Sequence, residues 1–170
     1  MISERMAEKL NYHINRELYS SYFYQAMSAY STHIGLNGFA NWFNVQVQEE
    51  LNHAQKVYTY IQQQGEKIEF FSVEAPENDF SSPKNLFEET LEHERFVTGL
   101  VYDLVKLAKE ESDFATDNFL QWFIKEQVEE EATASEILQK MNLIGDDKQS
   151  LLMLDQELAK RVFVNTALVE

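Results

Sequence analysis

The chain has 170 residues, of which 44 % are apolar and 25 % charged, and its 29 acidic against 14 basic residues give a formal net charge of −15. This length predicts a single domain over residues 1–170, and the apolar fraction excludes a disordered acidic tail. The absence of cysteine excludes disulfide scaffolds, thiolate metal sites and thiol catalysis, so any metal must be bound by oxygen and nitrogen ligands.

Charged residues in the first ten positions interrupt the apolar core that a signal peptide would need, and no later stretch approaches the length of a membrane span. We therefore expect a cytoplasmic protein without a membrane partner. The negative excess also disfavours binding to phosphate backbones, so no nucleic-acid partner is expected.

Five helical stretches follow one another, separated by glycine, proline and capping residues. They cover about residues 4–34, 37–64, 83–111, 114–144 and 147–163. Ser3, Ser82, Asp113 and Asp147 are the expected N-caps, and Pro83 follows Ser82 at the first helical position. Residues 65–82 have no helical period and form a connection longer than is usual between bundle helices. The pattern predicts an all-α four-helix bundle with a long crossover between helices 2 and 3 and a short fifth helix.

Polar side chains interrupt the apolar stripe of each long helix near its middle. These residues are Glu17, Glu50, His53, Glu94, Gln127 and Glu130. On a single helix, such glutamates would be interpreted as solvent-exposed. However, Glu17 and Glu50 are separated by 33 residues, as are Glu94 and Gln127, and the first helical hairpin matches the second at an offset of 77. This regularity indicates a duplicated hairpin with its polar positions in register.

The turns place these residues at one height. The midpoints of both pairs fall at or next to the breaks between their helices, and residues equidistant from a turn lie at the same level of an antiparallel pair. Several buried carboxylates without counter-charge would each cost on the order of several kcal/mol. A pair of iron or manganese ions held by carboxylate, imidazole and amide groups would reverse that cost.

With these motifs, the sequence resembles the bacterial and archaeal non-haem ferritins over essentially its whole length. The matching motifs are Glu17, Glu50-Leu51-Asn52-His53, Glu94 and Gln127-Val128-Glu129-Glu130. The resemblance implies that Glu17, Glu50 and His53 hold a first iron, that Glu50 bridges, and that Glu94 and Glu130 hold a second iron with Gln127 close by. It further implies a third iron position, formed by Glu49, Glu126, Glu129 and Glu130, and a redox role for Tyr24 beside the centre.

Two departures from the bacterioferritins imply that no haem is bound. Leu51 stands where bacterioferritins have a haem-ligating methionine, and the second half carries Gln-x-x-Glu in place of Glu-x-x-His.

The function implied by the resemblance is iron storage with ferroxidase activity. Fe(II) would be oxidised by O2 or H2O2, and the ferric product would be stored inside a homo-oligomeric shell of 24 chains. Two alternatives remain: a DNA-protecting miniferritin, which the negative charge and the lack of a basic tail disfavour, and a structural helical protein without metal.

Three further positions are weaker candidates. His13 precedes Glu17 by four residues, but its duplicate position is Thr90, so we expect no ligand there. His93 is expected at the surface. Asp117 lies where ferritins line a threefold iron channel with carboxylates, but Leu120 occupies the second acidic position of animal ferritins, which disfavours that uptake route.

Overall fold

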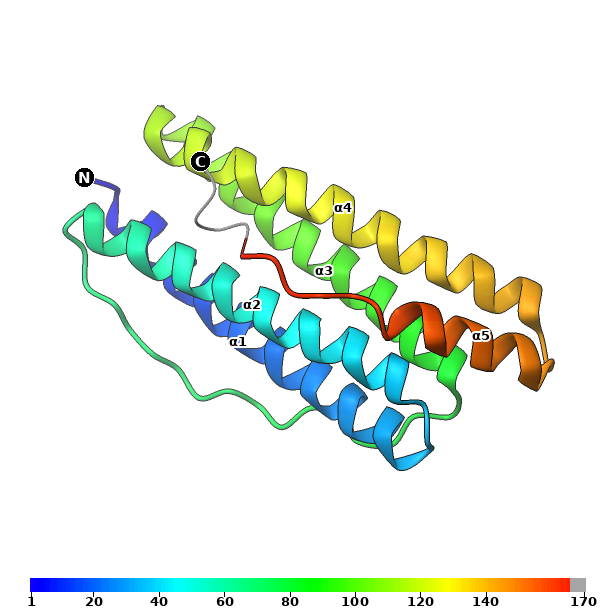
Figure 1. Cartoon of the computed structure of the whole chain (residues 1–170). Helices are drawn as coiled ribbons and strands as arrows, with labels where there is room; N and C mark the ends of the chain where they lie inside the picture. Colours follow the sequence, from blue (N-terminus) through cyan, green and yellow to red (C-terminus); the bar gives the residue numbers. More distant parts are fainter. Residues whose placement is uncertain (166–170) are drawn as a thin grey trace.

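The computed structural model describes residues 1–165, and within this range the chain forms five α-helices and no strand. They are α1 (Glu4–His33), α2 (Asn37–Gln63), α3 (Pro83–Glu110), α4 (Phe114–Ile144) and α5 (Lys148–Leu158). The four long helices lie side by side, and the crossover from α2 to α3 runs along the outside of the bundle (Figure 1). The predicted all-α four-helix bundle with a long crossover and a short fifth helix is confirmed. None of the described helices combines the length and apolarity needed to cross a membrane.

Side-chain caps define the starts of four helices, as the sequence predicted. The side chains of Ser3, Ser82, Asp113 and Asp147 each accept a hydrogen bond from a backbone N–H in the first turn of the helix that follows.

The start of α2 is capped by another helix. Leu36, at its N-cap position, provides no side-chain hydrogen bond. Instead, Oδ1 of Asp155 in α5 accepts from the backbone N–H groups of Gly38 at 2.8 Å and Phe39 at 3.0 Å. A Cβ atom at Gly38 would lie 1.7 Å from the backbone oxygen of Asp155, so only glycine allows this approach.

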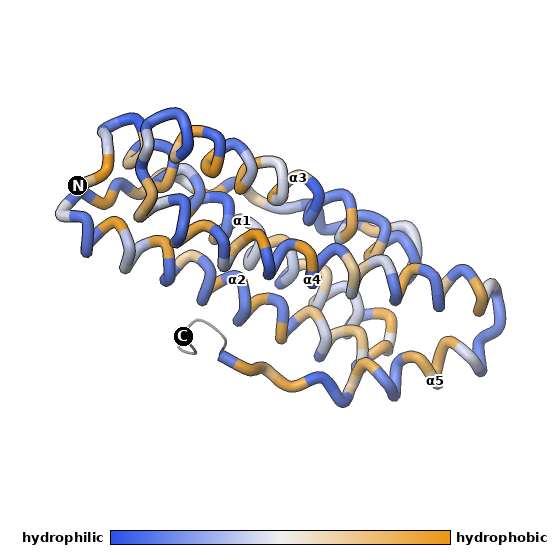
Figure 2. Tube along the Cα trace, turned by 90° about the horizontal axis from the view of Figure 1, so that it is seen from above, coloured by the Kyte–Doolittle hydropathy of each residue, from blue (hydrophilic) through white to orange (hydrophobic). Residues whose placement is uncertain are grey.

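Two apolar clusters fill the bundle on either side of a polar layer. One includes Leu10, Val57 and Phe123, and the other includes Phe39 and Phe87. Hydrophilic and hydrophobic positions alternate along each long helix (Figure 2), as expected for helices with one face in a core.

The fifth helix ends at Leu158, so the predicted extension to residue 163 is wrong. The side-chain amide of Asn41 in α2 donates to the carbonyl oxygens of Leu158, Ala159 and Arg161. These contacts hold the backbone against α2 in a non-helical path. The chain reverses at the turn from α4 to α5, and the segment after α5 continues along the bundle in the direction of that helix (Figure 1).

Candidate metal centre

The six polar residues predicted to face the interior are buried between the two apolar clusters. Each of the four long helices contributes: Glu17 from α1, Glu50 and His53 from α2, Glu94 from α3, and Gln127 and Glu130 from α4. None of these residues is more than 9 % exposed. A single chain therefore brings four carboxylates, one imidazole and one amide into its interior.

In one half of this layer, Glu17, Glu50 and His53 form a group suited to a metal ion. Each offers a ligand atom within 4.8 Å of the other two. His53 Nδ1 lies 3.3 Å from Oε2 of Glu50 and 3.9 Å from Oε2 of Glu17. Both oxygens of Glu17 and Oε1 of Glu50 are buried without a hydrogen-bond partner. Because buried carboxylate oxygens normally accept hydrogen bonds, Oε2 of Glu17 and Oε1 of Glu50 fit a cation as the missing partner.

In the other half, neutral donors orient the carboxylates. The Tyr24 hydroxyl donates to Oε1 of Glu94, and Nε2 of Gln127 donates to Oε2 of Glu94 at 3.2 Å. Nε2 of Gln46 donates to Oε2 of Glu130 at 3.0 Å. Gln46 is not among the predicted site residues, although it lies on the same stripe of α2 as Glu50, about one turn earlier.

Burial shifts the acidity of these carboxyl groups strongly. Burial raises the pKa of Glu50 well above its usual value, with Glu94 and Glu17 adding repulsion. Burial raises the pKa of Glu94 to about 8, and repulsion from Glu130 adds to it. Burial likewise raises the pKa of Glu130 to about 7, against the attraction of His53. The bare centre thus resists full ionisation, which a multivalent cation would relieve.

Glu17 differs from the other three carboxyl groups. Burial opposes its ionisation, but His13 and His53 outweigh that effect and lower its pKa to about 2. Glu17 is therefore the carboxylate of this layer that remains ionised throughout the ordinary pH range.

The three carboxylates predicted to form a third position with Glu130 lie further out. Glu49 and Glu126 are half-buried, and Glu129 is exposed. His53 Nε2 lies 4.0 Å from Oε2 of Glu126, so this ring faces the inner group through one nitrogen and Glu126 through the other. Burial raises the pKa of Glu49, and repulsion from Glu126 and Glu129 contributes to the shift, so the outer groups influence one another.

Arg161 occupies one side of this outer group. Its Nη2 atom lies 2.6 Å from Oε2 of Glu49, and its guanidinium carbon lies 4.4 Å from the centre of the Trp42 ring. The sequence pattern gave no sign of this contact, because Arg161 falls in the stretch predicted to be helical.

Tyr24 is fully buried beside the second half of the centre. Its hydroxyl contacts Glu94, and its ring stacks on Phe43 with the centroids 6.1 Å apart. Burial, with Glu94 and Glu50 adding repulsion, raises the pKa of Tyr24 well above its usual value, so this phenol is neutral.

Two histidines lie differently from the sequence expectations. His13 is buried, and its Nε2 lies 2.9 Å from Oε1 of Glu17, a contact that the comparison with Thr90 gave no reason to expect. His93 is half-buried rather than open to solvent. The aromatic rings of α1 cover it, Ser20 Oγ lies 2.8 Å from its Nε2, and burial lowers its pKa to about 4. The position of His93 on α3 predicts a surface residue, but side chains of α1 pack on that face of α3.

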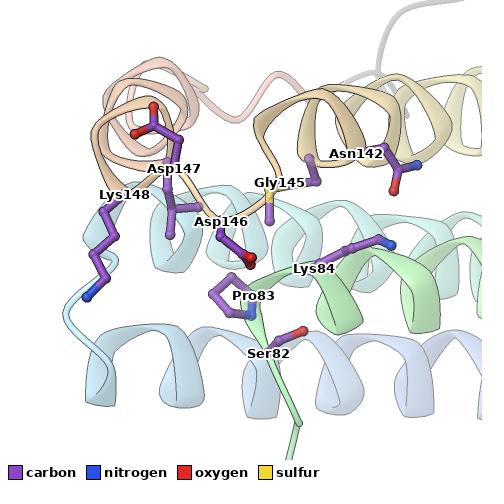
Figure 3. Close-up of a pocket in the computed structure, with 10 residues that line it drawn as sticks. Ser82, Pro83, Lys84, Asn142, Gly145, Asp146, Asp147 and Lys148 are labelled. Atoms are coloured by element: carbon purple, nitrogen blue, oxygen red, sulfur yellow. The ribbon is translucent and has the colours of Figure 1, made fainter.

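A pocket of about 470 Å³ lies elsewhere, between the start of α3 and the turn from α4 to α5 (Figure 3). Lys84 and Lys148 line it together with Asp146 and Asp147, so charges of both signs face it. It lies at the end of the bundle, whereas the buried carboxylates lie near the middle of their helices, and it takes no part in the metal centre.

Comparisons with known proteins agree with this architecture. The family model of the ferritin-like domain matches residues 7–144. The bacterial non-heme ferritin of Staphylococcus aureus strain MRSA252 is 41 % identical over 163 residues, which cover 96 % of this chain and 98 % of that protein. Its counterpart in Staphylococcus haemolyticus is 40 % identical over 163 residues, with the same coverage.

Solved structures of an archaeal ferritin match over nearly the whole chain. The open pore ferritin of Archaeoglobus fulgidus is 49 % identical, with a TM-score of 0.95 over 95 % of this chain and 100 % of that one. A closed form of that ferritin, engineered by site-directed mutagenesis, is 49 % identical, with a TM-score of 0.95 over 96 % of this chain and 100 % of that one. This chain therefore belongs to the ferritin family of iron-storage proteins.

Proposed function

We propose that this protein is a non-haem ferritin that takes up Fe(II), oxidises it with O2 or H2O2 inside each chain, and stores the ferric product. The observation that supports this most is the group of four buried carboxylates and one imidazole, several of whose oxygens have no donor. A structural bundle without metal would gain nothing from placing these charges in its core.

The proposed roles divide between the two halves of the buried layer. Glu17, Glu50 and His53 hold the first iron, and Glu50 bridges to the second. Glu94 and Glu130 hold the second iron, with Gln127 near it as a weak ligand. Carboxylate oxygens are hard ligands that stabilise Fe(III) relative to Fe(II), so the protein supplies charge and geometry while the iron undergoes the redox change.

The outer carboxylates would bind iron after its oxidation at the inner centre. We propose that Glu49, Glu126 and Glu129 form with Glu130 a third iron position, reached past the ring of His53. Tyr24 is proposed as a redox-active tyrosine, since its hydroxyl contacts Glu94 directly. Replacing Tyr24 with Phe should remove any tyrosyl radical signal seen by electron paramagnetic resonance during turnover while leaving Fe(II) binding intact.

The proposed setting is a cytoplasmic homo-oligomeric shell of 24 chains without haem. Leu51 is 47 % exposed on α2 and offers no sulfur to a haem iron. The alternative, a DNA-protecting miniferritin, is disfavoured because such proteins build their site between subunits, whereas one chain supplies all the residues here. Sedimentation should give a particle of twenty-four times the 19.9 kDa chain mass. A particle of twelve would favour the alternative.

Anaerobic Fe(II) titration followed by exposure to O2 tests the proposed chemistry. The wild-type protein should bind about two Fe(II) per chain tightly and oxidise them rapidly. Glu50→Ala should lose both properties while keeping its helical circular dichroism. Glu8→Ala, an exposed glutamate on α1, is the matched control. Absence of saturable binding, or rapid oxidation by Glu50→Ala, would overturn the proposal.

The third position needs its own experiment. The double variant Glu126→Ala with Glu129→Ala should keep the two inner ions and lose any further tightly bound iron. Unchanged stoichiometry and turnover in this variant would exclude a third position here.

A further inference from the structure

His13 is a buried histidine of α1 that the proposed roles leave unused. Its side chain is 1 % exposed, and neither ring nitrogen has a hydrogen bond of good geometry among the described residues. Nε2 nevertheless lies 2.9 Å from Oε1 of Glu17, one helical turn further along α1. Phe123 packs edge-on against the ring, with centroids 5.6 Å apart. Since unpartnered polar groups are costly in a core, this position indicates a task beyond packing.

The two oxygens of Glu17 face different partners. Oε1 contacts His13, whereas Oε2 lies 3.9 Å from Nδ1 of His53. The group suited to a metal ion consists of Glu17, Glu50 and His53, without His13. The Glu17 carboxylate therefore stands between His13 and the first metal position, and His13 reaches that position only through Glu17.

We propose that His13 is a positioning residue that engages Oε1 of Glu17 and leaves only Oε2 for the first metal ion, an inference that rests on the proposed metal centre. Ligating carboxylates are commonly held by such hydrogen-bonding partners, which fix their orientation. With Glu17 restricted to one oxygen, the ion keeps a lower coordination number, and a position stays open for the oxidant.

The surroundings of the ring allow this role. A cavity of about 60 Å³ between α1 and α3 adjoins His13 and is lined also by Lys9, Tyr12, Leu100, Asp103 and Leu104. This is room for about two waters, each of which takes about 30 Å³ in the liquid. The cavity therefore leaves room for a water beside the ring, as a second partner for a ring nitrogen while Nε2 lies against Glu17.

Anaerobic Co(II) titration of the assembled apo-protein tests this role, because the intensity of the visible absorption of Co(II) falls as its coordination number rises towards six. His13→Ala should weaken the first Co(II) site by about 10–100-fold and lower its absorption, since Glu17 becomes free to bind through both oxygens. His13→Gln retains a side-chain N–H at the right reach and should restore affinity and spectrum. His33→Ala, an exposed histidine at the end of α1, is the matched control.

Each other outcome counts against the proposal in a distinct way. If His13→Ala binds Co(II) with the affinity and spectrum of His33→Ala, His13 has no positioning role, while the metal centre stands. If His13→Gln fails to rescue while both variants fold, His13 is itself a ligand. If the wild-type protein binds no Co(II) saturably, the proposed metal centre and the role of His13 both fall.

Discussion

Glu94 illustrates the conflict between stability and metal binding at a single residue. It is 2 % exposed, and burial together with the nearby Glu130 raises its pKa to about 8. The bare protein therefore bears the cost of burying this carboxylate once the pH exceeds that value. Its hydrogen bonds from Tyr24 and Gln127 orient the group without supplying a positive charge.

Replacing Glu94 with Gln should stabilise the metal-free protein and impair metal binding. At pH 9 the neutral amide removes a buried charge, and we expect the free energy of unfolding to rise by about 1–3 kcal/mol. Urea unfolding at pH 9 and pH 6 measures the effect, which should be smaller at pH 6 because Glu94 is then already protonated. Glu92→Gln, at an exposed position of α3, is the control. A loss of stability at pH 9 would contradict this account.

The sequence predicted the inner residues because helical periodicity determines which side chains face the core. Glu17, Glu50 and Glu94 lie on apolar stripes. The spacing of 33 placed Glu17 level with Glu50 and Glu94 level with Gln127. The partner of a buried side chain on another helix is not encoded in that period. For this reason the contacts of Tyr24 with Glu94 and of Gln46 with Glu130 required the structure.

Among the elements, α5 is held to the bundle by polar contacts in its last turn and just beyond it. Asp155 caps α2, and the side-chain amide of Asn41 in α2 donates to carbonyl oxygens at and after the end of α5. The helix is only 11 residues long, too short to be stable in isolation. Its position therefore depends on this reciprocal capping and on the burial of Leu154 and Leu158.

Asp155→Ala should lower the free energy of unfolding by about 1 kcal/mol, the usual effect of removing an N-cap. Gly38→Ala should destabilise more strongly, because its Cβ would collide with the backbone of α5 rather than with a movable side chain. Urea unfolding of the assembled protein measures both effects, with Asp103→Ala, an exposed aspartate of α3, as the control. If Gly38→Ala unfolds like the wild type, α5 does not pack against the start of α2 as described.

The segment after α5 links the fold to the outer carboxylates through Arg161. Its guanidinium contacts Glu49 and Trp42, and the positive charge partly offsets the effect of burial on the pKa of Glu49. Arg161 is thus a resident cation at one of the proposed ligands of the third iron.

Arg161→Ala should therefore raise the affinity for a third divalent cation. A charge-assisted contact of this kind contributes about 1.5 kcal/mol, which corresponds to about tenfold in affinity. Calorimetric titration with Zn(II) measures the change against Arg5→Ala, which removes the same charge from an exposed pair with Glu110. If the two variants bind the third ion with equal affinity, Arg161 only holds the segment after α5 in place and does not affect cation binding.

The boundaries of the elements were predictable where they depend on local chemistry. Ser3, Ser82 and Asp113 cap helices through hydrogen bonds within one turn, so the sequence contains the whole signal. The end of α5 depends on Asn41, more than one hundred residues away in the sequence. No local pattern distinguishes the residues after Leu158 from a further helical turn.

At the scale of the whole molecule, the two hairpins are similar in backbone but different in chemistry. The α1–α2 half contains the unpartnered oxygens of Glu17 and Glu50 and both nearby imidazoles. The α3–α4 half contains carboxylates already satisfied by neutral donors. The common offset of 77 predicted the common height of the polar residues, and the different side chains of the two halves make the first half the stronger expected position for a cation.

The protonation of this layer should give the metal-free and metal-loaded proteins opposite responses to pH. The pKa values of Glu94 and Glu130 are raised to about 8 and about 7, so between about pH 4.5 and pH 8 the folded apo-protein binds more protons than the unfolded chain. Its stability should therefore fall as the pH rises through that window and level off above it. The lowered pKa of Glu17 acts only below this window, and the pKa of His93, lowered to about 4, offsets one of these groups only below its ordinary value of 6.5.

Metal binding must displace the same protons, so affinity should rise with pH over the interval in which apo-stability falls. Thermal unfolding should be followed from pH 6 to pH 8, with and without Zn(II) as a redox-inactive probe. The difference in unfolding temperature between the two series should increase steadily with pH. Titrations in buffers of different ionisation enthalpy should show proton release at pH 6.5. Glu94→Gln should release fewer protons, and Glu92→Gln should match the wild type. Metal binding without proton release would mean that the buried carboxyl groups are ionised before the ion arrives, and that their repulsion is balanced by another group.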